Sequence, residues 1–182
     1  VRKRGWSPGR TEAGRHAAAT LASAAGKLLA EPGGPRIAAL ELGGWDTHNA
    51  QGPRLKGQFA QLDEALGALQ TGLGTAWRQT AILVVTEFGR TARVNGTAGT
   101  DHGTAGVAFV LGGAVAGGKV RGDWPGLGPG QLFENRDLAP TTDVRAIAKG
   151  VLASHLGLEA SGLDAAFPGS NDAAPLRGLV RA

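Results

Sequence analysis

Two acid–histidine pairs in this chain are candidates for metal chemistry. Asp46 and His48 stand two residues apart, and Asp101 and His102 are adjacent. Carboxylate oxygens and imidazole nitrogens are common protein ligands of divalent metals, so both pairs indicate a metal site. The first pair also has a structural interpretation, in which Asp46 caps the helix that follows and His48 is an exposed side chain.

These candidate ligands lie at the edges of apolar runs that predict buried strands. The runs cover residues 36–42, 81–86 and 107–111. In open α/β sheets, ligands bind outside the carboxyl ends of the strands, where the loops of several strands meet. We therefore expect one rim of a sheet to carry five candidate metal ligands, which are Asp46, His48, Glu87, Asp101 and His102.

Three segments have the apolar spacing of amphipathic helices. Residues 12–30 are rich in alanine, residues 53–73 have large apolar side chains at steps of three and four, and a third helix is expected within residues 140–157. The strand–helix–strand order over residues 36–86 predicts a right-handed crossover and a parallel pair of strands. The expected fold is therefore α/β, with a mostly parallel sheet and flanking helices.

The composition is that of one domain without thiol chemistry. The chain has 182 residues, no cysteine and a formal net charge of +4, and this length is sufficient for a single domain with a core. Residues 1–15 carry five basic side chains and one acidic side chain, which leaves 14 of each sign in the rest. A nucleic-acid-binding domain would need a basic face, so we expect no nucleic-acid partner. We also expect no membrane span, because no apolar run approaches ~18 residues.

The ends of the sequence carry expectations of their own. The chain begins with Val1 and contains no methionine, so we expect it to be a piece of a longer protein. Within residues 1–182 we expect a single domain with a core at about 12–157. The segments 1–10 and 158–182 are irregular in sequence, and we expect both to be loosely held.

A long polar segment, residues 87–106, separates the second and third predicted strands. Loops of this length in compact domains are usually functional or disordered, and a position between two strong strands favours a function. Arg90 in this loop could bind an anionic substrate through two parallel hydrogen bonds. The alternative is that Arg90 ties down the loop itself.

Six motifs occur in an order that is typical of a known family. They are GGWDTH at 43–48, TEFGRT at 86–91, GTDHGTA at 99–105, LGGAV at 111–115, GDWPGL at 122–127 and RDLAPTTDVR at 136–145. On these motifs the chain resembles, over about residues 10–168, the C-terminal part of the bacterial family called domain of unknown function 1501. That family is similar in turn to the alkaline phosphatase and sulfatase superfamily. The resemblance implies an alkaline-phosphatase-like α/β fold with metal sites at the strand ends, here incomplete.

The resemblance also implies roles for individual residues. Asp46 and His48 match an aspartate with a following histidine, at a shorter spacing than is usual in the superfamily. Glu87 stands where the superfamily has an aspartate, and Phe88, which cannot ligate a metal, replaces the adjacent histidine. His102 matches a histidine ahead of a strand, with an aspartate beside it. The implied cofactor is a divalent metal such as zinc, manganese or calcium.

The activity implied by the resemblance is hydrolysis of a phosphate or sulfate ester, with a metal that polarises the ester oxygen and activates a hydroxyl nucleophile. In the superfamily the nucleophile comes from the N-terminal half of the domain. We therefore expect this chain to be the metal-ligating C-terminal portion, to have the missing half as its partner and to be inactive alone. The expected substrate is a small anionic ester, bound in part by Arg90.

Two further expectations concern the setting of the full-length protein. Members of the family often look like proteins of twin-arginine export, which implies a periplasmic or exported location. The alternative to the hydrolase is a non-catalytic member that uses the same fold for binding or for assembly at the cell envelope, because a fold does not determine a function.

Overall fold

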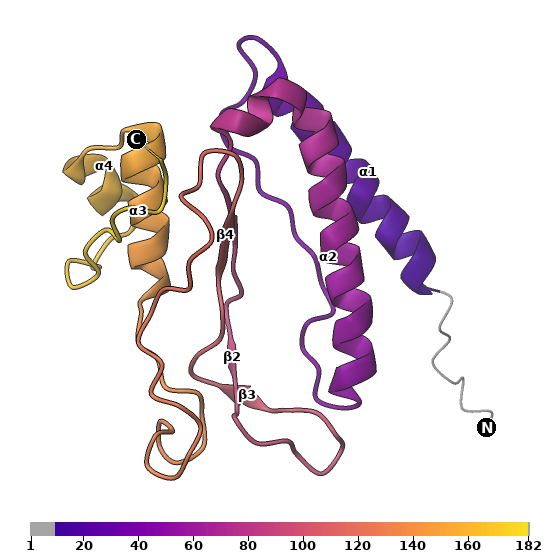
Figure 1. Ribbon diagram of the computed structural model, residues 1–182, viewed down its shortest axis with the longest axis vertical. Coiled ribbons are helices and arrows are strands. Elements are labelled where there is room, and N and C mark those ends of the chain that lie inside the picture. Colours follow the sequence, from indigo (N-terminus) through magenta and orange to yellow (C-terminus); the bar gives the residue numbers. More distant parts are fainter. Residues whose placement is uncertain (1–9, 182) are drawn as a thin grey trace. The chain divides into compact units, whose positions relative to one another are not determined.

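The computed structural model describes residues 10–181 (Figure 1). The chain divides into two compact units. Unit 1 comprises the chain up to Ala76 together with Thr97–Gly99, and unit 2 comprises Trp77–Gly96 and the chain from Thr100 onward. Of the segment 1–10 that the sequence predicted to be loosely held, residues 1–9 lie outside the described part.

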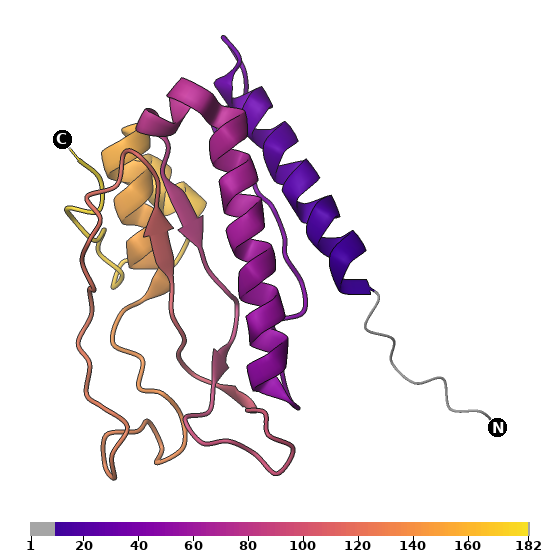
Figure 2. The ribbon, with the colours of Figure 1, turned by 45° about the vertical axis from the view of Figure 1, so that its right-hand side comes forward.

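Unit 1 is built on two long helices that lie side by side (Figures 1 and 2). Helix α1 spans Arg10–Ala30 and helix α2 spans Gln51–Leu73. The structure thus confirms the helices predicted at 12–30 and 53–73. A short 3-10 helix, η1 (Gly74–Gln79), follows α2.

The backbones of α1 and α2 approach closely because glycines lie where they meet. A Cβ added to Gly26 would lie 2.6 Å from the Leu69 carbonyl oxygen, and one added to Gly72 would lie 2.5 Å from the Ser23 carbonyl oxygen. Both distances are far below normal van der Waals contact, so only glycine allows this spacing. The buried apolar side chains of the two helices are Ala22, Ala65, Leu69 and Leu73.

The strand predicted at 36–42 is wrong. No residue of that run is in a strand, and its side chains Ile37 and Leu40 are 66% and 45% exposed. The chain contacts α2 just after this run, at Gly43 and Trp45. Gln58 Nε2 donates to the Gly43 carbonyl at 2.6 Å, and the Trp45 ring packs edge-on against Phe59 with 5.3 Å between centroids. The apolar residues of this run therefore did not indicate a strand.

Unit 2 contains two short antiparallel pairs of strands, so the predicted parallel sheet of an alkaline-phosphatase-like fold is wrong. Strand β1 (Ile82–Val84) pairs with β4 (Phe109–Leu111), with Leu83 opposite Val110. Strand β2 (Gly89–Arg90) pairs with β3 (His102–Gly103).

The connection between β1 and β4 explains their direction. A parallel pair needs a crossover that returns the chain to the same end of the sheet, usually through a helix. Here the connection contains only the antiparallel β2–β3 pair, and no helix is present in it. The chain therefore reverses, and β4 runs against β1.

The C-terminal part of unit 2 consists of helix α3 (Val144–Leu156), helix α4 (Ala160–Ala166) and an irregular tail. Asp143 caps the N-terminus of α3, because its carboxylate accepts from the Arg145 backbone N–H at 2.8 Å. Helix α3 confirms the third helix expected within 140–157. Within residues 10–181, the helices are too short or too polar to be membrane spans.

The tail that follows α3, which the sequence suggested is loosely held, makes specific contacts with that helix. The ammonium group of Lys149, a residue only 3% exposed, donates to the carbonyls of Ser170 and Ala173 at 2.7 and 3.1 Å. The Leu176 N–H donates to the Ala146 carbonyl at 2.8 Å. The buried charge is therefore satisfied by backbone carbonyls of the tail.

Candidate metal centre

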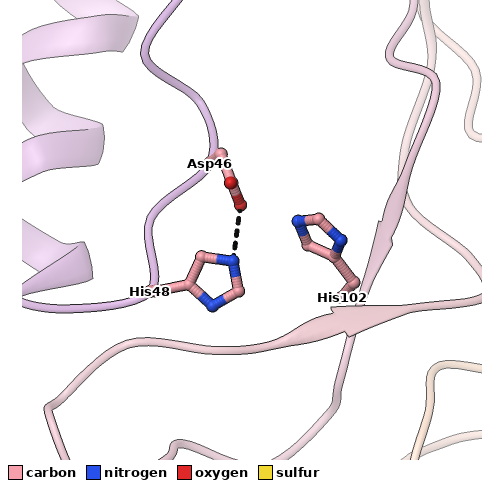
Figure 3. A group of neighbouring side chains, drawn as sticks. All are labelled: Asp46, His48 and His102. Carbon is pink, nitrogen blue, oxygen red and sulfur yellow. Dashed lines mark ion pairs between the residues drawn. The ribbon is translucent and has the colours of Figure 1, made fainter.

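Asp46 and His48 form a direct pair in the segment that leads into α2. His48 Nε2 lies 3.0 Å from Asp46 Oδ1, and the two side chains are 44% and 51% exposed (Figure 3). Thr47 between them is buried, and its hydroxyl donates to Gln51 Oε1 at 3.0 Å. Since the middle residue points inward, its two neighbours share the outer side of the segment. The two side chains that the spacing predicted to act together are therefore in contact.

A short piece of a distant loop is attached to the same segment within unit 1. The Thr97 hydroxyl donates to the His48 carbonyl at 2.7 Å, and the Thr97 carbonyl accepts from the Ala50 N–H at 3.0 Å. Gly99 lies against the backbone of His48 so closely that an added Cβ would overlap with the His48 carbonyl group. These contacts hold residues 97–99 beside His48.

His102 follows Gly99 by three residues and completes a group of three candidate ligands. One ligand atom from each of Asp46, His48 and His102 lies within 4.8 Å of the other two, and Figure 3 shows the side chains directed toward one another. Two ligands on a tetrahedral zinc ion are about 3.4 Å apart, given bond lengths of about 2.0–2.2 Å. All three residues are exposed to solvent.

The other two predicted ligands, Glu87 and Asp101, are not members of this group. The Thr86 hydroxyl donates to Glu87 Oε2 at 3.4 Å. Asp101 Oδ1 accepts from Asn95 Nδ2 at 3.0 Å, a bond within the loop. The structure thus brings together three of the five predicted ligands.

Arg90, the predicted substrate ligand, has contacts that support the loop. Its Nη1 donates to the Thr100 carbonyl at 2.9 Å, and its Cζ lies 4.7 Å from the centre of the Phe88 ring. These contacts match the alternative in which Arg90 ties down the loop. Its role toward a substrate stays a prediction.

The sequence did not single out Asp137, which is almost fully buried in unit 2. Arg136 donates to both of its carboxylate oxygens, at 2.7 and 3.0 Å, and the Thr104 hydroxyl donates to Asp137 Oδ2 at 2.8 Å. The Arg136 guanidinium, and after it the Thr104 hydroxyl, hold the pKa of Asp137 below its ordinary value. Because Thr104 lies two residues after His102, this charged network supports the strand that carries His102. An aspartate is usually exposed, so the sequence carries no signal that this one is buried.

The group consists of two imidazoles and one carboxylate on exposed segments, which is the ligand set of a candidate metal-binding protein. The chain belongs to the family described as Protein of unknown function (DUF1501), whose model matches residues 7–167. No curated protein and no solved structure matches the chain. The family that the six motifs indicated is therefore confirmed. The similarity to alkaline phosphatases and sulfatases is not shown, and the antiparallel strand pairs differ from the fold that it implied.

Proposed function

We propose that this chain binds one divalent metal ion through Asp46, His48 and His102. The observation that carries the proposal is the grouping of their ligand atoms within 4.8 Å. Three protein ligands leave at least one coordination position open, which is the arrangement of metal sites that act on a bound molecule rather than only on the fold. The exposure of all three side chains gives an ion direct access from solvent.

The ligand types favour some of the expected metals over others. Calcium prefers sites made entirely of oxygen ligands, whereas His48 and His102 offer two imidazole nitrogens. Imidazole together with one carboxylate suits zinc and first-row transition metals such as manganese or iron(II). Zinc or one of these metals is therefore the better fit, and calcium is the poorer one.

The proposed activity is hydrolysis of a small phosphate or sulfate ester in the full-length protein. A metal with an open position polarises an ester oxygen and lowers the pKa of a bound water or hydroxyl group. In this proposal the chain's own residues hold the ion, and Arg90 assists an anionic substrate from its place in the loop. The substrate class, like the periplasmic or exported setting, is proposed on the family resemblance.

A second proposal is a non-catalytic role, in which the metal site serves binding or assembly at the cell envelope. The half-exposed state of Asp46 and His48 favours it, because catalytic sites usually exclude water from the reacting groups. The hydroxyl nearest in sequence, that of Thr47, is buried and donates to Gln51. This hydroxyl is therefore a poor candidate for a nucleophile.

Elemental analysis and calorimetric titration test metal binding directly. The protein is purified without chelators for the first measurement and stripped of metal for the second. We expect one equivalent of zinc to bind wild type and binding to be lost in His48→Ala and in His102→Ala. His16→Ala and His155→Ala are matched controls, because they remove the chain's other two histidines. Wild-type zinc affinity in His102→Ala would refute the site.

Ester turnover separates the two functions. p-Nitrophenyl phosphate and p-nitrophenyl sulfate are supplied to the metal-loaded protein, both as these 182 residues and as a full-length protein that contains them. Turnover by the full-length protein that disappears in His102→Ala supports the hydrolase. Metal binding without turnover of either ester supports the non-catalytic role.

A further inference from the structure

The ring of Phe88 stacks on the imidazole of His102. Their centroids are 5.4 Å apart, and the ring planes differ by 18°. In the antiparallel β2–β3 pair, Arg90 stands opposite His102, so Phe88, two residues before Arg90, is a diagonal neighbour on the same face. Aromatic side chains span this diagonal distance. The strand register therefore places the Phe88 ring against His102.

Arg90 connects the same ring to the backbone that leads into His102. Its Cζ is 4.7 Å from the Phe88 centroid, within the range of a cation–π interaction. Its Nη1 donates to the carbonyl of Thr100, two residues before His102, at 2.9 Å. Arg90 therefore contacts both the Phe88 ring and the backbone just before His102.

We propose that Phe88 is a positioning residue of the metal site, whose ring sets the orientation of the His102 imidazole. This inference rests on the proposed metal-binding function. Phe88 offers no ligand atom, so its effect must pass through His102. A ligand whose rotation is already restricted loses less freedom when it binds, and residues behind metal ligands commonly contribute to metal affinity.

Paired substitutions at Phe88 test the role of the ring. Phe88→Leu removes the ring and keeps an apolar side chain, whereas Phe88→Tyr keeps the ring. Zinc affinity measured by calorimetry should fall about two- to tenfold in Phe88→Leu, in line with the usual strength of an aromatic pair. Phe88→Tyr should keep the wild-type zinc affinity. Phe133→Leu replaces another partly exposed phenylalanine and should leave the affinity unchanged.

NMR spectra of the metal-free protein give a readout that a general loss of stability would not move. The ring current of Phe88 should shift the Hδ2 and Hε1 resonances of His102. Phe88→Leu should change these two resonances and leave those of His16 and His155 in place, and Phe88→Tyr should return them toward their wild-type positions.

The outcomes distinguish this inference from the function on which it rests. Two results would overturn the positioning role and leave the metal site standing. One is wild-type zinc affinity in Phe88→Leu, and the other is a loss of affinity in Phe88→Tyr as large as that in Phe88→Leu. A wild-type protein that binds no zinc would instead remove the proposed function, and the inference with it.

Discussion

Gly99 and His48 are in backbone contact, and no side chain fits between them. A Cβ on Gly99 would overlap with the carbonyl carbon and oxygen of His48 and approach the Asn49 nitrogen. The same unit includes Thr97, whose hydroxyl donates to the His48 carbonyl at 2.7 Å. His102 is three residues from Gly99, a length of at most ~10–11 Å of extended chain. The contact therefore limits how far His102 can lie from its partner histidine.

Gly99→Ala should weaken metal binding without changing any ligand. The added methyl group must push residues 97–99 away from His48, and His102 moves with them. We expect zinc affinity to fall about tenfold or more, as is common for residues behind metal ligands. Calorimetric titration measures the change. Gly96→Ala is the matched control, because a Cβ at Gly96 meets no atom within 4 Å. Equal affinity of Gly99→Ala and wild type would contradict the role of this contact.

Zinc should raise the melting temperature of the protein. A ligand that binds only the folded state stabilises it by about 2.7 kcal/mol at a free concentration of ~100 Kd. For a chain of this length, that corresponds to a shift of roughly 5–10 °C. The shift should be absent in His102→Ala, retained in His155→Ala and smaller with calcium than with zinc. Melting curves of wild type that coincide with and without zinc would count against the site.

The helices of this protein could be predicted closely from the sequence, and the sheet could not. The periodicity of the apolar residues at 12–30 and 53–73 gives both the type and the extent of α1 and α2. The runs at 81–86 and 107–111 correctly located β1 and β4. Their antiparallel direction was missed, because an apolar run carries no information about which strand lies beside it. The run at 36–42 forms no strand, and its side chains Ile37 and Leu40 are exposed.

The candidate site was predicted in part, because Asp46, His48 and His102 were among the five ligands expected at one rim, whereas Glu87 and Asp101 are not members of the group. The two-residue spacing of Asp46 and His48 indicated their pair directly. His102 was expected beside them from its position ahead of a predicted strand, whereas the contact of Gly99 with the His48 backbone was not, because the sequence presents Gly99 only as one of 31 glycines. Phe88 was dismissed because it cannot bind a metal, although its contact with His102 depends on the β2–β3 register. Strand pairing and backbone contact are properties of the fold that residue types do not reveal.

The close packing of α1 and α2 predicts opposite effects for two glycine-to-alanine substitutions. A Cβ at Gly26 would lie 2.6 Å from the Leu69 carbonyl oxygen, so Gly26→Ala must separate the helices. We expect a loss of about 1–3 kcal/mol in the free energy of unfolding, the usual cost of overpacking. Gly67 lies exposed in α2 with no atom within 4 Å of an added Cβ. Gly67→Ala should therefore gain roughly 0.5–1 kcal/mol through helix propensity. Urea unfolding measures both, and effects of the same sign would contradict the packing.

The last prediction concerns the acid stability of the Asp137 network. Hydrogen bonds from Arg136, and then from Thr104, hold the pKa of Asp137 below its ordinary value in the folded protein. A carboxylate with a lowered folded pKa contributes stability at pH values above its unfolded pKa of about 3.9, and it loses this contribution as the pH falls through the folded pKa. Asp137→Asn should therefore be less stable than wild type at pH 7 and lose less stability between pH 5 and pH 2.

Urea unfolding at several pH values measures both effects, with the exposed Asp164→Asn as control. Thr104→Val removes one donor to the charged form, which brings the folded pKa of Asp137 closer to its ordinary value, so this variant should also lose less stability than wild type between pH 5 and pH 2. If Asp137→Asn lost stability below pH 4 as steeply as wild type, the acid sensitivity would have to come from other carboxylates.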